Sequence, residues 1–483
     1  MSFPLGTDGW RGVIAEGCTF AAIERVAEAT AAVYRGLSDG DTRRVVVGHD
    51  TRFFSPEFAR RAAEAFARAG IDVLLTDRAI PTPAVSDHVR ALGLAGGVAI
   101  TASHNPAAYN GFKIKSHFGG SASPQLYAEV ARRMEAGPVH PPPGSSAPGA
   151  IRVADLLAPY RERLASRVDV PAIGAAGLSI LADSMHGAAG TLVSDILSGG
   201  RTRVVAFRAE RDPLFGGVNP EPIEANLADA AERVRAEGLG LAVAQDGDAD
   251  RLGVLDARGR FVSPHRILAL LLLHAYRRRG LRGGIAKTFS TSLLIDRIAG
   301  SLGVPLHETG IGFKYIADLM NRGEAEAGGE ESGGYAFAFH LPERDGVLSA
   351  LLLIESLAAT GKDLEGALRD LTAEFGEFAY GRRDVALSIG IIAEFLAAVR
   401  DDPPAEVAGE RVTEVQERDG VKYAFGARGW LLHRMSGTEP LVRLYCEHED
   451  ASAVGRILAA AGDRLARFAA ARTARAGAGV ARS

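Results

Sequence analysis

The feature that most constrains the fold of this chain is an alternation of helical and buried-strand patterns over residues 21–321. Apolar residues recur at helical spacing in some segments and form short continuous runs in others. Strands separated by helices favour parallel sheets with helices packed on their faces. We expect strands at Arg44–Gly48, Ile71–Leu75, Gly97–Ile100, Leu178–Ala182, Val204–Phe207, Leu241–Ala244, Ile285–Thr288 and Val304–His307.

The helices expected between these strands cover residues 21–37, 84–92, 155–167, 191–197, 264–279, 291–302 and 312–321. A further helix has clear boundary signals, with Ser55 as its N-cap, Pro56 at its first position and Gly70 just after its end. The alternation forms three successive α/β blocks, and each delivers a glycine-rich polar loop after a strand. Because open α/β sheets bind ligands at the carboxyl ends of their strands, these loops are the natural site candidates.

The last part of the chain, residues 376–483, has a different pattern. Short strand patterns occur at 411–415, 421–425, 430–434 and 441–447, and a helix is expected over Ala451–Phe468. The stretch 138–150 is rich in proline, glycine and serine, which predicts a surface connection near a domain boundary. The sequence therefore predicts three α/β blocks followed by a smaller α+β block.

Composition and charge exclude several classes of protein. The 55 lysines and arginines against 59 aspartates and glutamates give a net charge of −4, so no global basic field is present to hold nucleic acid. The two cysteines, Cys18 and Cys446, cannot form a disulfide framework and fit a reducing compartment. The first residues lack the pattern of a signal peptide, and no aliphatic run approaches the ~18 residues that span a bilayer. We expect a soluble, cytoplasmic protein without nucleic-acid or membrane partners, and the sequence does not identify protein partners.

The loop Thr101–Pro106, with the sequence TASHNP, follows an expected buried strand and places Ser103 beside His104. It lacks the G-x-S-x-G elbow that exposes the serine of many serine hydrolases. An ordinary turn, punctuated by Asn105 and Pro106, is the alternative for this segment taken alone.

The loop Asp246–Arg251, with the sequence DGDADR, places three carboxylates at alternate positions, where they can converge on one hard cation. A calcium EF-hand is excluded, because its sixth position would be glycine and is Arg251, and its twelfth would be glutamate and is Ala257. A solvated acidic turn is the alternative. Three close aspartates repel one another unless a cation lies among them, which favours Mg²⁺.

Two more glycine-rich loops carry polar side chains. GGEESGG, at Gly328–Gly334, presents carboxylates and a hydroxyl on a loop that a sugar can approach closely. RMSGTEP, at Arg434–Pro440, combines a guanidinium, two hydroxyls and backbone N–H groups, which together suit a phosphate. Taken alone, each loop is also consistent with a plain turn or a connection between strands.

The order GTDGWRG, TASHNP with NGFK, DGDADR, GGEESGG and RMSGTEP resembles the α-D-phosphohexomutases, the superfamily of phosphoglucomutase and phosphomannomutase. The motifs run from Gly6 to Arg443 and so cover nearly the whole chain. The resemblance implies three related α/β domains with mixed sheets and a smaller α+β C-terminal domain, around a central active-site cleft. The implied domains are 1–148 with the phosphoserine loop, 149–257 with the metal loop, 258–375 with the sugar loop and 376–483 with the phosphate loop.

The resemblance also implies roles for single residues. Ser103 matches the serine that carries a phosphoryl group and supplies one metal ligand. The other implied Mg²⁺ ligands are Asp246, Asp248 and Asp250. The further catalytic residues implied are His104, Lys113, Arg11 and Arg251, with Thr7 in the N-terminal loop. The implied sugar-binding residues are Glu330, Ser332 and Lys314, and the implied phosphate-binding residues are Arg434, Ser436, Gly437, Thr438 and Arg443.

The implied reaction interconverts glucose 1-phosphate and glucose 6-phosphate, with Mg²⁺ as cofactor and glucose 1,6-bisphosphate as activator and intermediate. Phospho-Ser103 gives its phosphoryl group to the sugar phosphate, and the bisphosphate turns around before it rephosphorylates the serine. Three aspartates and a phosphoserine sum to about −5 charges, and Mg²⁺ reduces this only to about −3. Arg251, Lys113 and Arg11 are expected to offset the rest. A protonated His104 would add one more positive charge.

The choice of sugar depends on finer features of the sequence. Gly334 stands where dual-specificity phosphomannomutase/phosphoglucomutases have histidine, so the loop resembles that of phosphoglucomutases and favours glucose over mannose or dual specificity. The general acid/base is then unassigned, and Lys287, Lys314 and the segment Arg344–Gly346 are candidate replacements. Two other classes stay open, an inactive sugar-phosphate-binding protein and a phosphatase.

Overall fold

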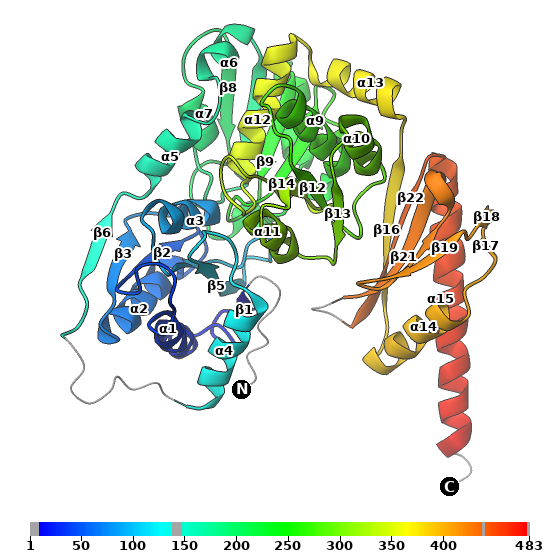
Figure 1. Ribbon diagram of the computed structural model, residues 1–483, viewed down its shortest axis with the longest axis horizontal. Coiled ribbons are helices and arrows are strands. Elements are labelled where there is room, and N and C mark those ends of the chain that lie inside the picture. The colour runs from blue at the N-terminus through cyan, green and yellow to red at the C-terminus, as the bar shows by residue number, and fades with distance from the viewer. Residues whose placement is uncertain (1–8, 138–146, 437–439, 481–483) are drawn as a thin grey trace. The chain divides into compact units, whose positions relative to one another are not determined.

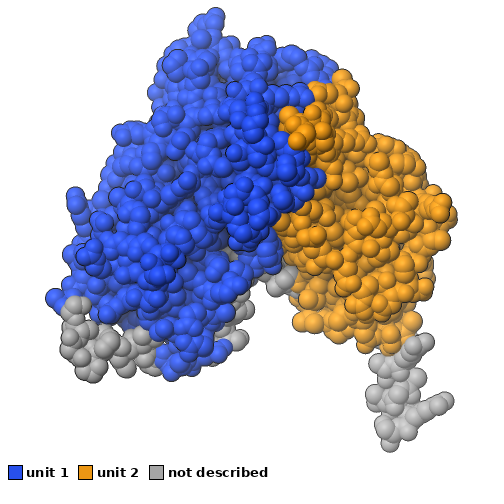
Figure 2. Space-filling model, in the orientation of Figure 1, with its two compact units in different colours: residues 1–286, 304–307, 312–370 blue, residues 287–303, 308–311, 371–483 orange. Residues whose placement is uncertain are grey.

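The computed structural model describes residues 9–137, 147–436 and 440–480. Its helices and strands follow one another as Figure 1 shows. The chain forms two compact units (Figure 2), of which unit 1 comprises residues 1–286, 304–307 and 312–370 and unit 2 comprises residues 287–303, 308–311 and 371–483. Within the described residues, no helix is both long enough and apolar enough to cross a membrane.

The first block consists of β1 (Trp10–Val13), α1 (Phe20–Tyr34), β2 (Arg44–His49), α2 (Ser55–Arg68), β3 (Asp72–Thr76), α3 (Thr82–Ala91), β4 (Gly96–Ile100), β5 (Tyr109–Ser116), α4 (Pro124–Glu135) and β6 (Ile151–Ala154). Its sheet has the order β1-β5-β4-β2-β3-β6. Strands β4, β2, β3 and β6 are parallel to one another. Strand β5 pairs antiparallel with β4, and β1 pairs antiparallel with β5. Helices α1 and α2 pack together and bury Ile23, Phe58 and Phe66 against the sheet.

The second block consists of α5 (Leu157–Ala165), α6 (Val170–Ala176), β7 (Ser179–Asp183), α7 (Leu192–Ile196), β8 (Arg203–Phe207), two short 3-10 helices (Phe215–Gly217 and Glu224–Asn226), α8 (Ala228–Glu237), β9 (Leu241–Gln245), β10 (Leu252–Asp256) and β11 (Phe261–Val262). The sheet order is β11-β10-β9-β7-β8. Because β10 runs antiparallel to β9, the chain reverses direction within the intervening residues 246–251. Ala249 takes a left-handed φ of 59° at this reversal.

The third block consists of α9 (Pro264–Arg277), β12 (Gly284–Thr288), α10 (Leu294–Leu302), β13 (Leu306–Thr309), α11 (Phe313–Asn321), β14 (Ala325–Gly329), β15 (Tyr335–Phe337), α12 (Gly346–Thr360) and α13 (Leu364–Phe375). Its sheet has the order β13-β12-β14-β15. Strands β14 and β15 pair as an antiparallel hairpin, and Glu330–Gly334 forms its turn.

The C-terminal block consists of β16 (Ala379–Ala386), α14 (Ile389–Asp401), β17 (Glu406–Val407), β18 (Glu410–Arg411), β19 (Glu414–Glu417), β20 (Val421–Ala424), a 3-10 helix (Gly426–Arg428), β21 (Gly429–Met435), β22 (Leu441–His448) and α15 (Ala451–Val480). Its main sheet is antiparallel throughout, in the order β16-β22-β21-β20-β19. Helices α14 and α15 bury Ile392, Phe395 and Ile457 with residues of the sheet. The fold class predicted from the sequence, three α/β blocks with mixed sheets and an α+β block, is confirmed.

The sequence prediction for the start of α2 was wrong in one respect. Ser55 is the first helical residue, and the N-cap position belongs to Phe54, which has a left-handed φ of 62° and no capping side chain. The Ser55 hydroxyl instead donates a hydrogen bond to Asp50 Oδ1 at 2.6 Å, because the helix begins next to that buried carboxylate. Most of the proline-rich connection, residues 138–146, lies outside the described residues.

Candidate active site

Ser103 lies in the loop that follows β4, and its backbone is held in an unusual conformation. Its φ is 52°, in the left-handed region that residues other than glycine rarely adopt. The side chain is buried, and its Oγ donates a hydrogen bond to Asp246 Oδ2 at 2.9 Å. The Thr101 hydroxyl accepts a hydrogen bond from the backbone N–H of Ser103 at 2.8 Å. The loop therefore presents the serine hydroxyl to the aspartate loop of the second block.

The three aspartates of the DGDADR loop converge. Asp246, Asp248 and Asp250 are buried, and one carboxylate oxygen from each lies within 4.8 Å of the other two. Asp246 Oδ1 accepts hydrogen bonds from the backbone N–H groups of Asp250, at 2.9 Å, and Arg251, at 3.1 Å. The tight reversal between β9 and β10 thus turns three alternate side chains toward one point.

Two buried cations contact this cluster from different blocks. Lys113 on β5 places its Nζ 2.8 Å from Asp248 Oδ2 and 3.0 Å from Asp250 Oδ2. Arg344, just before α12, places Nη2 2.8 Å from Asp250 Oδ2. All of these side chains belong to unit 1, so the first three blocks contribute to one polar centre.

The donor set fits a hard divalent cation. Burial raises the pKa of Asp246 well above its ordinary value, and the neighbouring Asp250 and Asp248 carboxylates raise it further. Within the described part of the chain, Asp250 Oδ1 is buried and takes part in no hydrogen bond. Three carboxylates with a serine hydroxyl beside them form the oxygen-only environment that Mg²⁺ prefers.

The surroundings of His104 disfavour a positive charge on its imidazole. Burial lowers the pKa of this group well below its ordinary value, and the cationic side chains of Arg251 and Arg11 lower it further. Its Nδ1 lies 3.4 Å from Ser103 Oγ.

The two arginines that the sequence singled out lie in the same unit. Arg251 places Nη1 3.2 Å from Glu221 Oε1, and Arg11 on β1 donates a hydrogen bond from Nη1 to Asn105 Oδ1 at 2.6 Å. Asn105 belongs to the Ser103 loop, so Arg11 is joined to that loop directly. Thr7, from the same N-terminal motif, lies outside the described residues.

Glu330 and Arg344 connect the GGEESGG turn to the aspartate cluster. Glu330 Oε1 accepts a hydrogen bond from the backbone N–H of Gly312 at 3.1 Å, and its Oε2 lies 3.7 Å from Arg344 Nη1. A Cβ atom at Gly334 would lie 2.3 Å from Arg344 Cδ. Glycine at position 334 therefore leaves the room that the arginine side chain occupies.

We expect the titration of Glu330 to change the stability of the fold with pH. Burial raises its pKa from 4.5 to about 7, so the folded state binds more protons than the unfolded state between these values. Stability is therefore lost as pH rises through this window, by on the order of 3 kcal/mol for a shift of this size. Chemical denaturation of wild type and Glu330→Gln at pH 5 and pH 8 should show the variant gaining relative stability at pH 8. A difference that does not depend on pH would contradict the assignment.

Ser332 and Lys314 are the other residues predicted to bind the sugar, and Lys287 is a candidate for the acid/base. Ser332 is half-buried in the same turn as Glu330. Lys314 lies in the first turn of α11, with its Nζ 5.1 Å from the ring centroid of Tyr315. Lys287 lies in unit 2, where it is buried and pairs with Asp296.

Unit 2 contains the residues predicted to bind phosphate. Arg434 on β21 and Arg443 on β22 are direct cross-strand partners, and they lie 3.2 Å from Asp419 and 3.9 Å from Asp384 respectively. Because directly opposite residues of an antiparallel pair lie on the same face of the sheet, the two guanidinium groups share one face. Ser436 is buried just after Arg434, whereas Gly437 and Thr438 lie outside the described residues.

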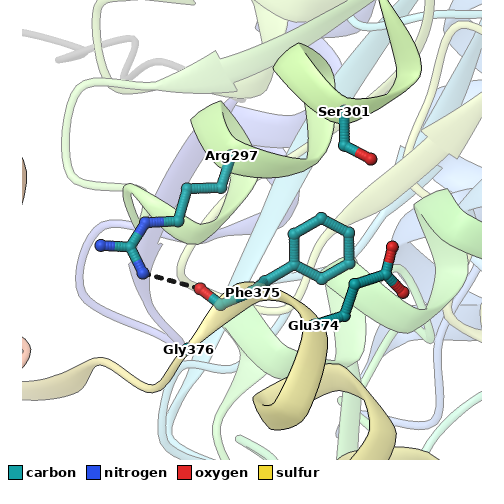
Figure 3. Close-up of a pocket in the computed structure, with 5 residues that line it drawn as sticks. All are labelled: Arg297, Ser301, Glu374, Phe375 and Gly376. Atoms are coloured by element: carbon teal, nitrogen blue, oxygen red, sulfur yellow. Dashed lines mark hydrogen bonds between the residues drawn. The ribbon is translucent and has the colours of Figure 1, made fainter.

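Unit 2 also has a pocket of about 540 Å³ lined by Arg297, Ser301, Glu374, Phe375 and Gly376 (Figure 3). Arg297 donates a hydrogen bond to the backbone carbonyl of Phe375 at 2.7 Å, so its guanidinium holds the chain at the end of α13. None of the residues singled out from the sequence lines this pocket. We therefore assign the candidate active site to the serine and aspartate loops.

Sequence reasoning missed two side chains that contact the site. The Thr82 hydroxyl donates to Asp248 Oδ2 at 2.6 Å, and Glu221 pairs with Arg251. Neither lies in a glycine-rich loop or a repeated charge pattern, so no sequence signal marked them. The sequence named Arg344 only as part of the candidate segment Arg344–Gly346. Its side chain occupies the space next to Gly334, and this position distinguishes it from the rest of that segment.

Four family models match successive parts of the chain. Phosphoglucomutase/phosphomannomutase alpha/beta/alpha domains I, II and III match residues 4–138, 158–259 and 263–375, and the C-terminal domain of the same family matches residues 396–463. Together these matches cover most of the sequence.

Individual proteins resemble the chain over almost its whole length. A phosphoglucomutase/phosphomannomutase of Thermococcus kodakarensis is 32% identical over 444 residues, which is 92% of this chain and 94% of that protein. A phosphoglucosamine mutase of Parafrankia sp. is 32% identical over 468 residues, covering 92% and 95%. A crystal structure from Thermus thermophilus, described as a phosphomannomutase, has a TM-score of 0.84 and 37% identity, covering 96% of this chain and 99% of that one.

Proposed function

Because the chain belongs to the phosphoglucomutase/phosphomannomutase family, we propose that it interconverts glucose 1-phosphate and glucose 6-phosphate through a phosphorylated Ser103. The observation that carries the proposal is the buried Ser103 hydroxyl, held 2.9 Å from Asp246 among three converging aspartates. The Ser103 loop lacks the sequence of a hydrolase elbow, but it has the electrostatic surroundings that phosphoryl transfer requires.

In the proposed reaction, the bond between phosphorus and Ser103 Oγ breaks as a sugar hydroxyl oxygen bonds to phosphorus. The sugar hydroxyl loses its proton and Ser103 Oγ regains one. His104, whose Nδ1 lies 3.4 Å from Ser103 Oγ, is the side chain that we propose relays this proton. The resulting 1,6-bisphosphate then presents its other phosphate to Ser103, and the same steps run in reverse.

Asp246, Asp248 and Asp250, with an oxygen of phospho-Ser103, are the residues that would hold Mg²⁺. When bound there, this ion would neutralise charge on the transferring phosphoryl group. Lys113, Arg251, Arg11 and Arg344 supply further positive charge.

Glucose is the proposed sugar because Gly334 makes the turn phosphoglucomutase-like and gives Arg344 its place beside Glu330. Glucosamine phosphate is the second candidate, since a relative of 32% identity is a phosphoglucosamine mutase. Mannose phosphate is a third, suggested by the phosphomannomutase description of the Thermus structure. A cytoplasmic location remains a prediction.

A coupled assay with glucose 1-phosphate and a trace of glucose 1,6-bisphosphate tests the proposal. We expect glucose 6-phosphate to appear at a kcat/KM higher than the values for mannose 1-phosphate and glucosamine 1-phosphate, measured by ³¹P NMR under the same conditions. Release of inorganic phosphate instead would indicate a phosphatase. Binding without turnover of any of the three would indicate an inactive sugar-phosphate-binding protein.

We propose that Arg434, Ser436, Gly437, Thr438 and Arg443 bind the phosphate that is not reacting. Arg434→Ala should then lower kcat/KM about ten- to a hundredfold for glucose 1-phosphate and glucose 6-phosphate alike, because each presents its unreacted phosphate to this loop. Steady-state kinetics in both directions measure the effect. The matched control is Arg428→Ala, since Arg428 is an exposed arginine of the same unit that pairs with Glu410 and Glu449. Unchanged constants for both sugars would assign the phosphate site elsewhere.

A further inference from the structure

Arg52, which lies between β2 and α2, is a completely buried arginine that contacts the Ser103 loop at several carbonyls. Its Nη2 donates hydrogen bonds to the backbone carbonyls of Ser103, at 2.5 Å, and Asn105, at 2.6 Å. Its Nη1 donates to the carbonyls of Pro106, at 2.8 Å, and Tyr109, at 3.0 Å. A single guanidinium therefore holds three carbonyls of the loop that carries the serine and the carbonyl of the first residue of β5.

Arg52 is itself held in place by buried groups. Its Nε lies 3.1 Å from Asp50 Oδ2, and both side chains are fully buried. Asp50 Oδ1 accepts hydrogen bonds from the Ser55 hydroxyl and from the backbone N–H of Arg52. The guanidinium carbon also lies 4.9 Å from the ring centroid of Phe215, in the second block. These contacts hold the Arg52 side chain in one conformation, in which Nη1 and Nη2 face the Ser103 loop.

The loop needs such support because Ser103 is strained. A left-handed backbone at a residue other than glycine persists only where the surrounding structure imposes it. The Ser103 carbonyl lies against Gly247, where an added Cβ atom would be 2.6 Å from its oxygen, so this peptide packs closely on the metal loop. The orientation of this peptide sets the direction of the Ser103 side chain toward Asp246.

We propose that Arg52 is a positioning residue for phosphoryl transfer, holding the Ser103 loop in its strained conformation so that Oγ faces the aspartate cluster. The inference rests on the proposed mutase function. Arg52 touches the loop only through backbone carbonyls, and it acts on the reaction through Ser103. Only arginine offers a planar fork whose nitrogens can serve four carbonyls and a carboxylate together, and a lysine ammonium has three donors at one point.

The test compares Arg52→Lys with wild type in both directions of the reaction. We expect kcat to fall about ten- to a hundredfold, the scale on which small misplacement of a reacting group acts. KM for glucose 1-phosphate and glucose 6-phosphate should change little, and single-turnover phosphorylation of Ser103 by glucose 1,6-bisphosphate should slow by the same factor. The matched control is Arg279→Lys, because Arg279 also joins a carboxylate, Glu355, and a carbonyl, that of Arg167, but contacts no residue of the site.

A second pair of variants covers the case in which Arg52→Lys does not fold. Asp50→Asn with Arg52→Gln removes both buried charges together, and Glu355→Gln with Arg279→Gln is its control. The inference is supported if the Arg52 variant loses kcat while its control, at similar melting temperature, does not. It is overturned if kcat stays within twofold of wild type, or if both members of a pair lose it equally. A wild-type protein without turnover would overturn the proposed function as well, whereas an active wild type beside unaffected variants would overturn this inference alone.

Discussion

Replacing Ser103 with alanine is expected to abolish mutase turnover, lowering kcat by at least about 10⁴-fold. The variant lacks the oxygen that forms and breaks the bond to phosphorus, the same oxygen that contacts Asp246 in the structure. The fold should persist, because alanine keeps the Cβ atom and loses only the contacts of one hydroxyl. The coupled assay measures turnover, and peptide mass spectrometry of wild type should locate a phosphoryl group on Ser103.

The matched control for this prediction is Ser86→Ala. Ser86 is a buried serine of the same unit, and within the described residues its hydroxyl makes no hydrogen bond. We expect normal turnover and nearly unchanged stability from that variant. Near-normal activity in Ser103→Ala, or a phosphoryl group that maps only to another residue of the wild-type protein, would refute the role proposed for Ser103.

Most parallel strands of the first two blocks could be predicted from the sequence because they are continuous apolar runs, although the parallel strand β6 was missed. The expected strands Arg44–Gly48 and Leu241–Ala244 match β2 and β9 within one residue. Buried parallel strands have no polar face, so their signal is strong even without an alignment. The same pattern located the ends of these strands, and with them the loops that carry Ser103 and the aspartates.

The antiparallel strands of the C-terminal block were predicted, at 421–425, 430–434 and 441–447, but strand β5 of the first block was missed for a physical reason. Strand β5 contains Lys113 and Lys115, whose charges make the segment read as a polar loop, yet both side chains are buried. Lys113 is paired with two aspartates, and Lys115 with Glu343 at 2.7 Å. The partners lie more than a hundred residues away along the chain, so local pattern cannot reveal them. Charged residues that belong to a site therefore concealed the strand that positions them.

The candidate site was predictable as a set of residues but not as a geometry. Motif order indicated Ser103, the three aspartates and Lys113, and the structure brings these side chains together. The lowered pKa of His104 depends on its burial and on cationic side chains from other segments, and the place of Arg344 depends on the missing side chain at Gly334. Both are consequences of packing between blocks. The exact domain boundaries predicted from the sequence, and the roles of Thr7, Gly437 and Thr438, remain predictions.

Asp248→Asn tests whether the aspartate cluster holds a divalent cation. Asparagine keeps the shape of the side chain and its contact with the Thr82 hydroxyl, but it removes one of the three carboxylate charges. We expect Mg²⁺ binding by calorimetry to weaken strongly, and kcat/KM to fall on the order of 10²–10³-fold, as when one preorganised charge contact is lost. Chelation of wild type should abolish turnover and lower its melting temperature, and added Mg²⁺ should restore both, because a ligand that binds only the folded state stabilises it.

The control Asp256→Asn changes a buried aspartate at the end of β10 that pairs with Arg260, and it should bind Mg²⁺ normally. Wild-type Mg²⁺ affinity in Asp248→Asn would mean that the ion binds elsewhere, and would refute the aspartate cluster as the metal site.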